Sequence, residues 1–569
     1  MDSFKKTKQV VFDFLTFVFI GTFIGIVMSL VSNAFVIGVS YISKKRLLPD
    51  LFVFDLFDRE YSISPLIFLL IAGFLVILIK KIFNLKRYQG PADSILVAHR
   101  TNSEPDIKIG IGSTLAAFVS ASGGASVGQY GPLVHFGATV GSFMRRITKK
   151  LLTTEIFLGC GVAGAISAGF NAPLTGLVFA HEAIIRNFSQ KAIAPIAISS
   201  ITASAFTQYI FGDRNILQLS EVSPNLIEIL PFVLITGPLF GILAILFMSS
   251  LRRSASFAAK SSLSPNQLII LASFICGSVG IFFPEILGLG TDTITNMFLD
   301  RYDLYFLLIL VVFKILMTTI CIGFGLFGGV FSPALFIGAS GGAAATKIFT
   351  IFGFGVSGSA LTVCGLAAVG AAIIGAPIST VLIVLEMTNS YEFAVIALVS
   401  VVTCKLVSNI LYGHSFFDRQ LLDRGIDISL GRTHLKLGSL NIMKFTQSTG
   451  YLSMDKSSKV TQVIEEMVKK NVTEVYLTNS KKEFLGKVLL GNLTKTSTSE
   501  AIDEIEKKPL LIYSDSSVLD AIKTASDFVG ESIPIIDRAN NRLQGIITES
   551  DLLKAYLSIQ KETQKIETE

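Results

Sequence analysis

The sequence contains no tryptophan and little charge. Only 16% of its 569 residues are Asp, Glu, Lys or Arg, whereas 51% are hydrophobic, and the mean hydropathy is +0.63. This composition excludes a soluble protein of this length, because too few polar residues remain to cover its surface. The net charge is +6, but no long block of lysine and arginine occurs, so nucleic acid is not an expected partner. The composition predicts an integral membrane protein.

Signatures of metal binding and catalysis are also missing. All five cysteines lie in apolar segments and none has the spacing of metal ligands, so we expect packing thiols and no metal site. The apolar region offers no nucleophile paired with a base, so we do not expect an enzyme. The first apolar run is long and lacks a small-residue cleavage site, which favours a retained helix over a cleaved signal peptide.

Long apolar runs are abundant, and runs of about 20 residues can cross a bilayer. Examples are Val10–Ser32, Ile67–Phe83, Ile193–Phe211, Ile227–Met248, Leu304–Ile322 and Phe393–Leu411. The stretch from Val10 to Ile42 would reach about 50 Å as one helix, so we expect it to tilt steeply or break. Lysines ahead of it and a polar region at the other end predict a multi-pass protein of the cell membrane with both termini in the cytoplasm.

Two glycine-rich stretches interrupt the apolar pattern, GQYGPLVHFGA at Gly128–Ala138 and GGVFSPALFIGA at Gly328–Ala339. In each, a proline pre-sets the first turn of an apolar helix. The free N–H groups and dipole of such a helix start favour an anion. Broken helices are tolerated in membranes only where they line a cavity or pack against protein. We therefore expect the two stretches to be facing halves of one anion-binding centre, with a third helix start at Gly90-Pro91.

The apolar region contains an internal repeat. Pro132 and Pro333 are 201 residues apart, and Glu182 and Glu386 are 204 residues apart. Paired broken helices in repeated halves point to a transport site near the middle of the membrane. We expect a membrane domain at residues 1–436, with repeats at about 60–212 and 225–412.

The chain becomes polar beyond this region, and residues 437–569 read as a separate domain. An amphipathic helix, two strands and another helix start are followed by a second unit in the same order, with Gly486 and Gly545 as equivalent glycines. The pattern predicts a tandem α/β module with units at about 441–498 and 508–560.

Four ordered motifs, GQYGPLVHFG, FNAPLTGLVFAHE, GGVFSPALFIG and APISTVLIVLE, resemble those of the CLC chloride channels and chloride/proton antiporters. The tail resembles a pair of CBS domains. The resemblance implies a polytopic α-helical membrane protein with an inverted-topology repeat and broken helices, followed by an α/β CBS pair. It also implies a homodimer in the lipid bilayer that carries chloride. The implied anion ligands are the backbone N–H groups of Val330 and Phe331 after Gly329, together with Gly131 in the first stretch.

The gate departs from the family pattern. GQYGP resembles the family's GREGP, in which a glutamate fills the outer anion site and swings away on protonation. Tyr130 stands at that position here. A phenol stays neutral at physiological pH, so Tyr130 does not compete with chloride as a charge or readily carry a proton. Three roles stay open: donating its O–H to an anion, plugging the pore by size, or packing without a gating role.

The inner proton position departs as well. Glu182 matches the family's structural glutamate, but Ala183 follows where antiporters of the family carry an acid. Intramembrane carboxylates are costly and mark proton paths, so the loss of both removes the usual path. His181 precedes Glu182 and is able to titrate, although a neutral hydrogen-bonded histidine is the simpler interpretation. The same applies to His135.

Both inner hydroxyl donors of the family are also altered. Phe417 takes the place of a tyrosine, and Gln89 or Gly90 takes the place of a serine. A Gln89 amide facing the pore would donate N–H where the hydroxyl did. Chloride is the default anion, with nitrate, bromide and fluoride left open.

The CBS resemblance implies an adenine nucleotide (ATP, ADP or AMP) between the two units. Gly545, Thr548 and Asp551 fit the family's nucleotide motif, with Asp551 placed for ribose hydroxyls, while the first unit has Asn492 in the Asp place. A purely structural, dimerising role is the alternative.

These observations predict passive anion conduction by a CLC dimer without obligatory proton exchange. One alternative is a coupled antiporter that uses His181 or water for the proton. Another is a nucleotide-responsive sensor. Simultaneous chloride and proton flux from the same vesicles separates the first two.

Overall fold

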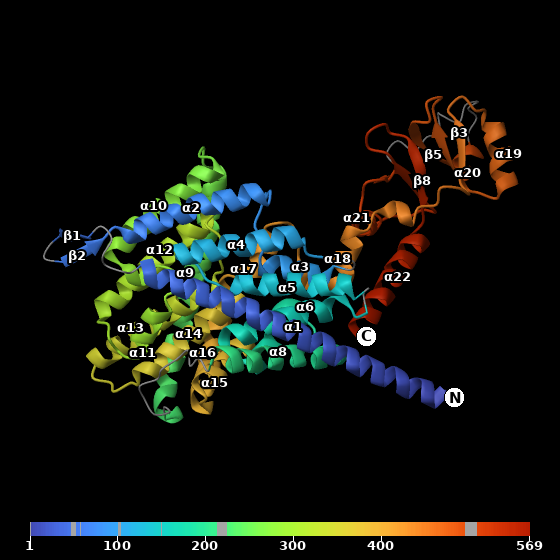
Figure 1. Ribbon diagram of the computed structural model, residues 1–569. Helices are drawn as coiled ribbons and strands as arrows, with labels where there is room; N and C mark the ends of the chain where they lie inside the picture. Colours follow the sequence, from blue (N-terminus) through green and yellow to red (C-terminus); the bar gives the residue numbers. More distant parts are fainter. Residues whose placement is uncertain are drawn as a thin grey trace. The chain divides into compact units, whose positions relative to one another are not determined.

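The computed structural model describes residues 2–46, 53–56, 59–100, 104–148, 151–212, 225–495 and 509–568. The chain divides into two compact units, Met1–Ile426 and Asp427–Glu569. The division falls ten residues before the boundary expected from the composition, because the helix at Gly431–Ser439 belongs with the second unit. Figure 1 shows the first unit as a helical body and the second as a smaller α/β body.

The helices of the first unit follow the apolar pattern of the sequence. In its first half they are α1 (Asp2–Arg46), α2 (Ser64–Ile82), α3 (Pro91–His99), α4 (Ile107–Gly123), α5 (Tyr130–Ile147), α6 (Thr154–Phe170), α7 (Pro173–Phe179), the π-helix η1 (Ala180–Ile185) and α8 (Gln190–Phe211). A short antiparallel hairpin, β1 (Val53–Leu56) and β2 (Arg59–Ser62), lies between α1 and α2.

The second half repeats this order. Its helices are α9 (Leu226–Lys260), α10 (Pro265–Phe282), the 3₁₀ turn η2 (Pro284–Ile286), α11 (Thr291–Phe298), α12 (Leu304–Gly323), α13 (Phe331–Ile351), α14 (Gly358–Ile374), α15 (Pro377–Thr388), α16 (Tyr391–Leu411) and α17 (Phe416–Leu422). Within the described ranges, eight helical segments are long and apolar enough to cross a membrane, as a multi-pass membrane protein requires.

The long first run forms one unbroken helix, α1, so of the two expectations the break is wrong. Glycines let α1 lie close along α8: a Cβ on Gly21 would be 2.7 Å from the Pro195 carbonyl oxygen, and one on Gly25 would be 2.5 Å from that of Ser199. Contacts of this kind hold transmembrane helices together, because small residues allow the backbones to approach.

The predicted repeat is visible in matched helix crossings. In the first half, a Cβ on Gly137 of α5 would lie 2.3 Å from the carbonyl oxygen of Gly161 in α6. In the second half, a Cβ on Gly338 of α13 would lie 2.1 Å from the carbonyl oxygen of Gly365 in α14. The same backbone-to-backbone contact therefore positions the helix that follows each glycine-rich stretch.

The second unit is a tandem α/β module, as the sequence predicts. One three-stranded sheet has β3 (Leu452–Asp455), β4 (Glu474–Thr478) and β5 (Phe484–Leu489), and the other has β6 (Ile512–Tyr513), β7 (Ile533–Ile536) and β8 (Leu543–Ile547). In both sheets the first pair is parallel and the second antiparallel. The helices are α18 (Gly431–Ser439), α19 (Val460–Lys470), α20 (Leu490–Leu493), α21 (Val518–Thr524) and α22 (Glu549–Thr568).

Candidate functional site

Three helix starts meet at one point in the first unit. Gly128 and Gly329 exchange both of their backbone hydrogen bonds, each with an N···O distance of 2.6 Å, and so join the two glycine-rich stretches. A Cβ on Gly131 would lie 3.1 Å from the Gly329 Cα and 3.6 Å from Cγ of Pro91. The starts of α3, α5 and α13 therefore converge, and only glycine permits this approach of backbones.

The first amides of α13 are the best anion ligands at this point. Val330 and Phe331 are buried at its start, and within the described ranges no protein acceptor takes their N–H groups. Unpaired N–H groups at a helix start carry a partial positive charge, which suits a dehydrated anion. The structure thus brings Gly131, Gly329, Val330 and Phe331 together, while anion binding by them stays a prediction.

At the third helix start, the Gly90 amide already has a hydrogen-bond acceptor. The N–H of Gly90 donates to Oδ2 of Asp93 at 3.0 Å, so a carboxylate of its own helix caps α3. The Gly90 amide therefore already has an acceptor in its own helix, and anion binding at this helix start stays a prediction. Gln89 donates its backbone N–H to Oγ of Ser113 at 3.1 Å, which leaves its side-chain amide for other partners.

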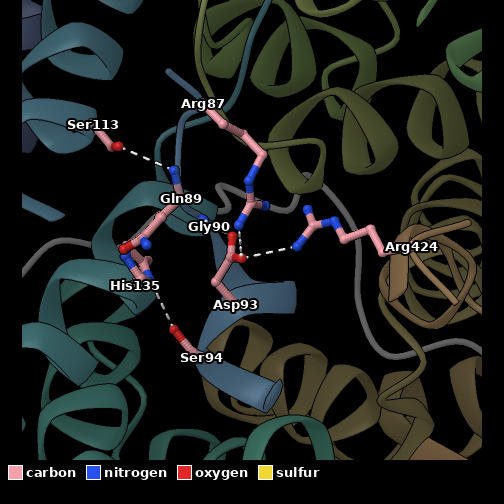
Figure 2. A network of polar contacts seen from close by, with 8 residues as sticks. All are labelled: Arg87, Gln89, Gly90, Asp93, Ser94, Ser113, His135 and Arg424. Atoms are coloured by element: carbon pink, nitrogen blue, oxygen red, sulfur yellow. Dashed lines mark hydrogen bonds and ion pairs between the residues drawn. The ribbon is translucent and has the colours of Figure 1, made fainter. Parts of the chain in front are cut away.

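Asp93 is also the centre of a charge cluster (Figure 2). Its Oδ1 accepts from Arg87 at 2.7 Å and from Arg424 at 2.8 Å, and the Asp93 side chain is 9% exposed. Carboxylate–guanidinium bonds are among the stronger hydrogen bonds in proteins. They tie the start of α3 to the segment after α17. Sequence analysis missed this cluster, although Asp93 stands at the third position of a helix that begins Gly-Pro, where a capping carboxylate is common.

Tyr130 lies inside an aromatic cluster. Its ring stacks on Phe170 with centroids 3.8 Å apart and meets the edge of Phe331 at 5.8 Å, and the Phe170 and Phe331 rings are 5.5 Å apart. Its hydroxyl donates a long hydrogen bond of 3.4 Å to the Gly169 carbonyl. Only 7% of Tyr130 is exposed, so the side chain faces the convergence point and not the lipid. Phe170, which ends α6 and completes the cluster, was missed from the sequence.

The two repeated glutamates form a reciprocal clasp. The Glu182 carboxylate accepts from the N–H groups of Ile378 and Ser379 at 2.9 and 2.8 Å, at the start of α15. The Glu386 carboxylate accepts in the same way from the start of α7, including the Thr175 N–H at 2.8 Å. Each half therefore supplies a carboxylate to a helix start of the other half, where the dipole favours negative charge.

The remaining predicted residues lie in η1, beside Glu182, and in α17. Ala183 is buried in the π-helix η1 and brings no acid there. In the same helix, Nδ1 of His181 lies 2.8 Å from the Asn187 carbonyl oxygen, while Nε2 has no partner among the described residues. Phe417 is buried in α17, which packs against α3. It therefore brings an apolar ring, and no hydroxyl, to this region.

The predicted nucleotide residues of the second unit form hydrogen bonds within the protein. Oδ2 of Asp551 accepts from the Thr548 hydroxyl at 2.7 Å and from the Gln447 amide at 2.6 Å. Partial burial opposes charge on Asp551, but these hydrogen bonds outweigh it and lower the pKa of its carboxyl below the ordinary value. A Cβ on Gly545 would be 2.6 Å from the Gln447 carbonyl oxygen, so glycine is required there.

A cleft of about 950 Å³ lies elsewhere in the second unit. Its lining includes Asn492 and Lys495 from the first α/β half and Tyr513, Asp527 and Glu531 from the second. Gly545, Thr548 and Asp551 are not among its lining residues. The cleft thus lies between the two α/β halves, and Thr548 and Asp551 cap the start of α22 outside it.

Comparison with known proteins agrees with this architecture. Residues 71–409 match the family model described as voltage gated chloride channel, and residues 502–558 match the CBS domain model. Over 322 residues the chain is 28% identical to the "H(+)/Cl(-) exchange transporter ClcA" of Vibrio parahaemolyticus. This alignment covers 53% of the chain and 66% of the relative, just under two thirds of its length.

Solved structures share the fold. A slow cyanobacterial Cl−/H+ antiporter superposes with a TM-score of 0.61 at 22% identity, covering 72% of this chain and 97% of that one. A eukaryotic CLC transporter superposes with a TM-score of 0.60 at 18% identity, covering 95% of this chain and 98% of the other. Because the channel model matches more than half of the sequence and the fold agrees, the chain belongs to the voltage gated chloride channel (CLC) family, with a CBS domain in its carboxyl-terminal unit.

Proposed function

We propose that this CLC-family protein conducts chloride, and other small anions, passively and without obligatory proton exchange. The observation that carries the proposal is Tyr130, a neutral phenol packed between Phe170 and Phe331 at the point where the helix starts meet. A carboxylate there would exchange protons as it moved, whereas a phenol moves without changing charge. Ala183 supports the same conclusion, since it leaves the inner position without an acid.

The test is simultaneous chloride and proton flux from the same vesicles. Purified protein in liposomes under a chloride gradient is expected to release chloride while the internal pH stays constant once the membrane potential is clamped by a potassium ionophore. Uphill proton movement in a fixed ratio to chloride would overturn the proposal. Empty liposomes and liposomes with the Tyr130→Glu variant serve as the matched controls for leak and for introduced coupling.

Proton-coupled exchange is the second candidate. Two observations favour it: the relative from Vibrio parahaemolyticus is named as an exchange transporter, and His181 keeps one ring nitrogen unpartnered among the described residues. Under this alternative the proton passes through the imidazole. Uphill proton movement that persists in wild type and disappears in His181→Gln, with chloride flux retained, would establish it.

We further propose that the protein is a homodimer in the bilayer, with both termini on the cytoplasmic side. The glutamate clasp supports the dimer, because residues that donate to it are well exposed: Leu174 is 53% and Ile378 is 55% exposed. A second copy that covers these apolar side chains would also shield the hydrogen-bonded carboxylates of the clasp. Single-particle mass measurement in nanodiscs is expected to give twice the 61.4 kDa chain mass, and a monomer mass would reject the dimer.

Adenine nucleotide binding by the second unit stays a prediction. The 950 Å³ cleft supports it, while the engagement of Asp551 with Gln447 and Thr548 favours the structural role instead. Thermal unfolding of the full-length protein with ATP, ADP and AMP tests it directly. A nucleotide-dependent rise in the unfolding temperature that Asp551→Ala leaves unchanged would assign the ligand to the cleft. No rise with any of the three would leave the dimerising role.

A further inference from the structure

A lysine is fully buried inside the membrane unit. Lys314 lies in α12, a helix long and apolar enough to cross a membrane, and its exposed fraction is 0%. A charged side chain at such depth is costly, and those that occur usually have a functional reason. Lys314 belongs neither to the converging helix starts nor to the aromatic cluster around Tyr130, so its burial calls for another explanation.

Two carbonyl oxygens and an aromatic ring surround the ammonium group of Lys314. Its Nζ donates to the carbonyl oxygens of Ile286 and Gly288, each at 2.9 Å. It also lies 4.7 Å from the centre of the Phe336 ring in α13. Carbonyl acceptors and the face of a ring suit a protonated lysine, which has three donors and no acceptor. Lys314 therefore fixes the turn between η2 and α11 against α12.

The same turn is bonded to the first half of the membrane unit. The N–H of Gly288 donates to the carbonyl oxygen of Gly124 at 3.0 Å. Gly124 ends α4 in the left-handed conformation, with a φ of 106°. The chain then runs directly into the first glycine-rich stretch, which begins at Gly128. Gly288 thus connects Lys314, through its carbonyl, to the end of α4, through its amide.

Helix α12 holds the approach to the first stretch at a second point. Oγ of Ser126 lies 2.9 Å from Oγ1 of Thr318, and both side chains are fully buried. Thr318 stands four residues after Lys314, so the two side chains share one face of α12, about one turn apart. Both attachments restrain the short segment that joins α4 to Gly128.

The second glycine-rich stretch follows α12 directly. The helix ends at Gly323, and the stretch begins at Gly328. The helix that leads into one stretch therefore also holds the other, and the two hydrogen bonds between Gly128 and Gly329 join them. A site built from backbone groups of two segments needs both segments in register, because a misplacement of about 1 Å is enough to weaken it severely.

We propose that Lys314 is a positioning residue for the anion. By holding the turn between η2 and α11, and through it the end of α4, Lys314 keeps the first glycine-rich stretch in register with the second. The inference rests on the proposed anion conduction and adds to it the side chain that preorganises the converging helix starts. Lys314 acts on the anion through the backbone of Gly288 and Gly124.

The test removes each attachment and separates anion affinity from maximal flux. Lys314→Met loses the donor and keeps a long side chain; the half-saturating chloride concentration is expected to rise about tenfold, the effect of losing one hydrogen bond from a charged group. Maximal flux per folded protein is expected to change less than about twofold. Ser126→Ala is the milder variant, with an expected rise of about threefold. The double variant should exceed the product of the single effects, because either attachment alone still restrains the segment.

A matched control and a binding measurement decide between outcomes. Lys347→Met removes the same charge from α13, where Lys347 pairs with Asp300 at 2.7 Å, and its half-saturating concentration is expected to be that of wild type. Isothermal titration with bromide measures binding without relying on flux. Wild-type bromide affinity in folded Lys314→Met, or a loss of maximal flux alone, would overturn the inference while leaving conduction intact. Absent chloride flux in wild type, with bromide binding weakened in Lys314→Met, would overturn the proposed conduction alone.

Discussion

Replacing Tyr130 with alanine is expected to increase chloride flux strongly. To let an anion pass the convergence point, the Tyr130 ring must leave its stack on Phe170 at 3.8 Å and its edge contact with Phe331 at 5.8 Å. Each aromatic contact of this kind is worth about 0.5–1.5 kcal/mol, so displacement costs roughly 1–3 kcal/mol. Its hydroxyl adds little, because the hydrogen bond to Gly169 is 3.4 Å long.

The free-energy cost sets how often the Tyr130 ring is displaced. At about 1.36 kcal/mol per factor of ten, the displaced state of Tyr130 is occupied roughly 0.6–15% of the time. Alanine removes both ring contacts and the need for displacement. Flux per protein is then expected to rise roughly 6- to 150-fold, with no change in proton movement.

Chloride efflux from liposomes, normalised to the amount of reconstituted protein, measures the effect. Tyr130→Phe is the matched control, since it retains both ring contacts and removes the hydroxyl with its long hydrogen bond to Gly169; its flux is expected within about twofold of wild type. If Tyr130→Ala conducts at the wild-type rate, the ring does not obstruct the path and its role is packing alone. If Tyr130→Phe matches the alanine variant, the hydroxyl and not the stack controls the gate.

Three other predictions follow from the remaining contacts. Tyr130→Glu is expected to make flux fall as pH rises through the carboxyl pKa, because the ionised side chain competes with the anion; pH-independent flux in stopped-flow assays would place the residue off the path. Glu182→Gln and Glu386→Gln are each expected to destabilise the membrane unit by about 2 kcal/mol and by similar amounts, since each weakens equivalent bonds to a helix start; clearly unequal melting temperatures in detergent would contradict the symmetry of the clasp. The lowered pKa of Asp551 means that its contribution to stability is present above the ordinary carboxyl pKa and is lost as pH falls through the lower folded value. The protection factors of the α22 amides should therefore fall below about pH 4 in wild type, whereas Asp551→Asn should show low protection at every pH.

Local patterns predicted much of the fold. Gly-rich segments followed by proline marked the starts of α5 and α13, because glycine permits close backbone approach and proline favours the first turn. The paired helix starts also predicted that these stretches face each other, and the hydrogen bonds between Gly128 and Gly329 show that they do. The unbroken α1 was not predictable from length alone, since it depends on how Gly21 and Gly25 fit against α8.

Contacts between distant segments explain what the sequence did not reveal. Asp93 and Arg424 are 331 residues apart, and no sequence pattern around either residue indicates that they pair. Phe170 reads as an ordinary apolar helix end until Tyr130 is seen to stack on it. The hydrogen bond of the Gly90 amide has the same origin, because it goes to a carboxylate that two arginines hold in place.

Under the proposed function, a tyrosine at position 130 changes which quantity controls anion passage. A carboxylate gate leaves its site when a proton neutralises it, so its movement depends on pH and ties chloride to protons. An aromatic gate leaves when ring contacts are lost, and the free energy of those contacts contains no proton. The second family position is also without a charge, because Ala183 holds no acid. With no titrating carboxylate left at either family position, the proposed function predicts that the dependence of flux on chloride and on pH separates: flux follows chloride and changes little with pH.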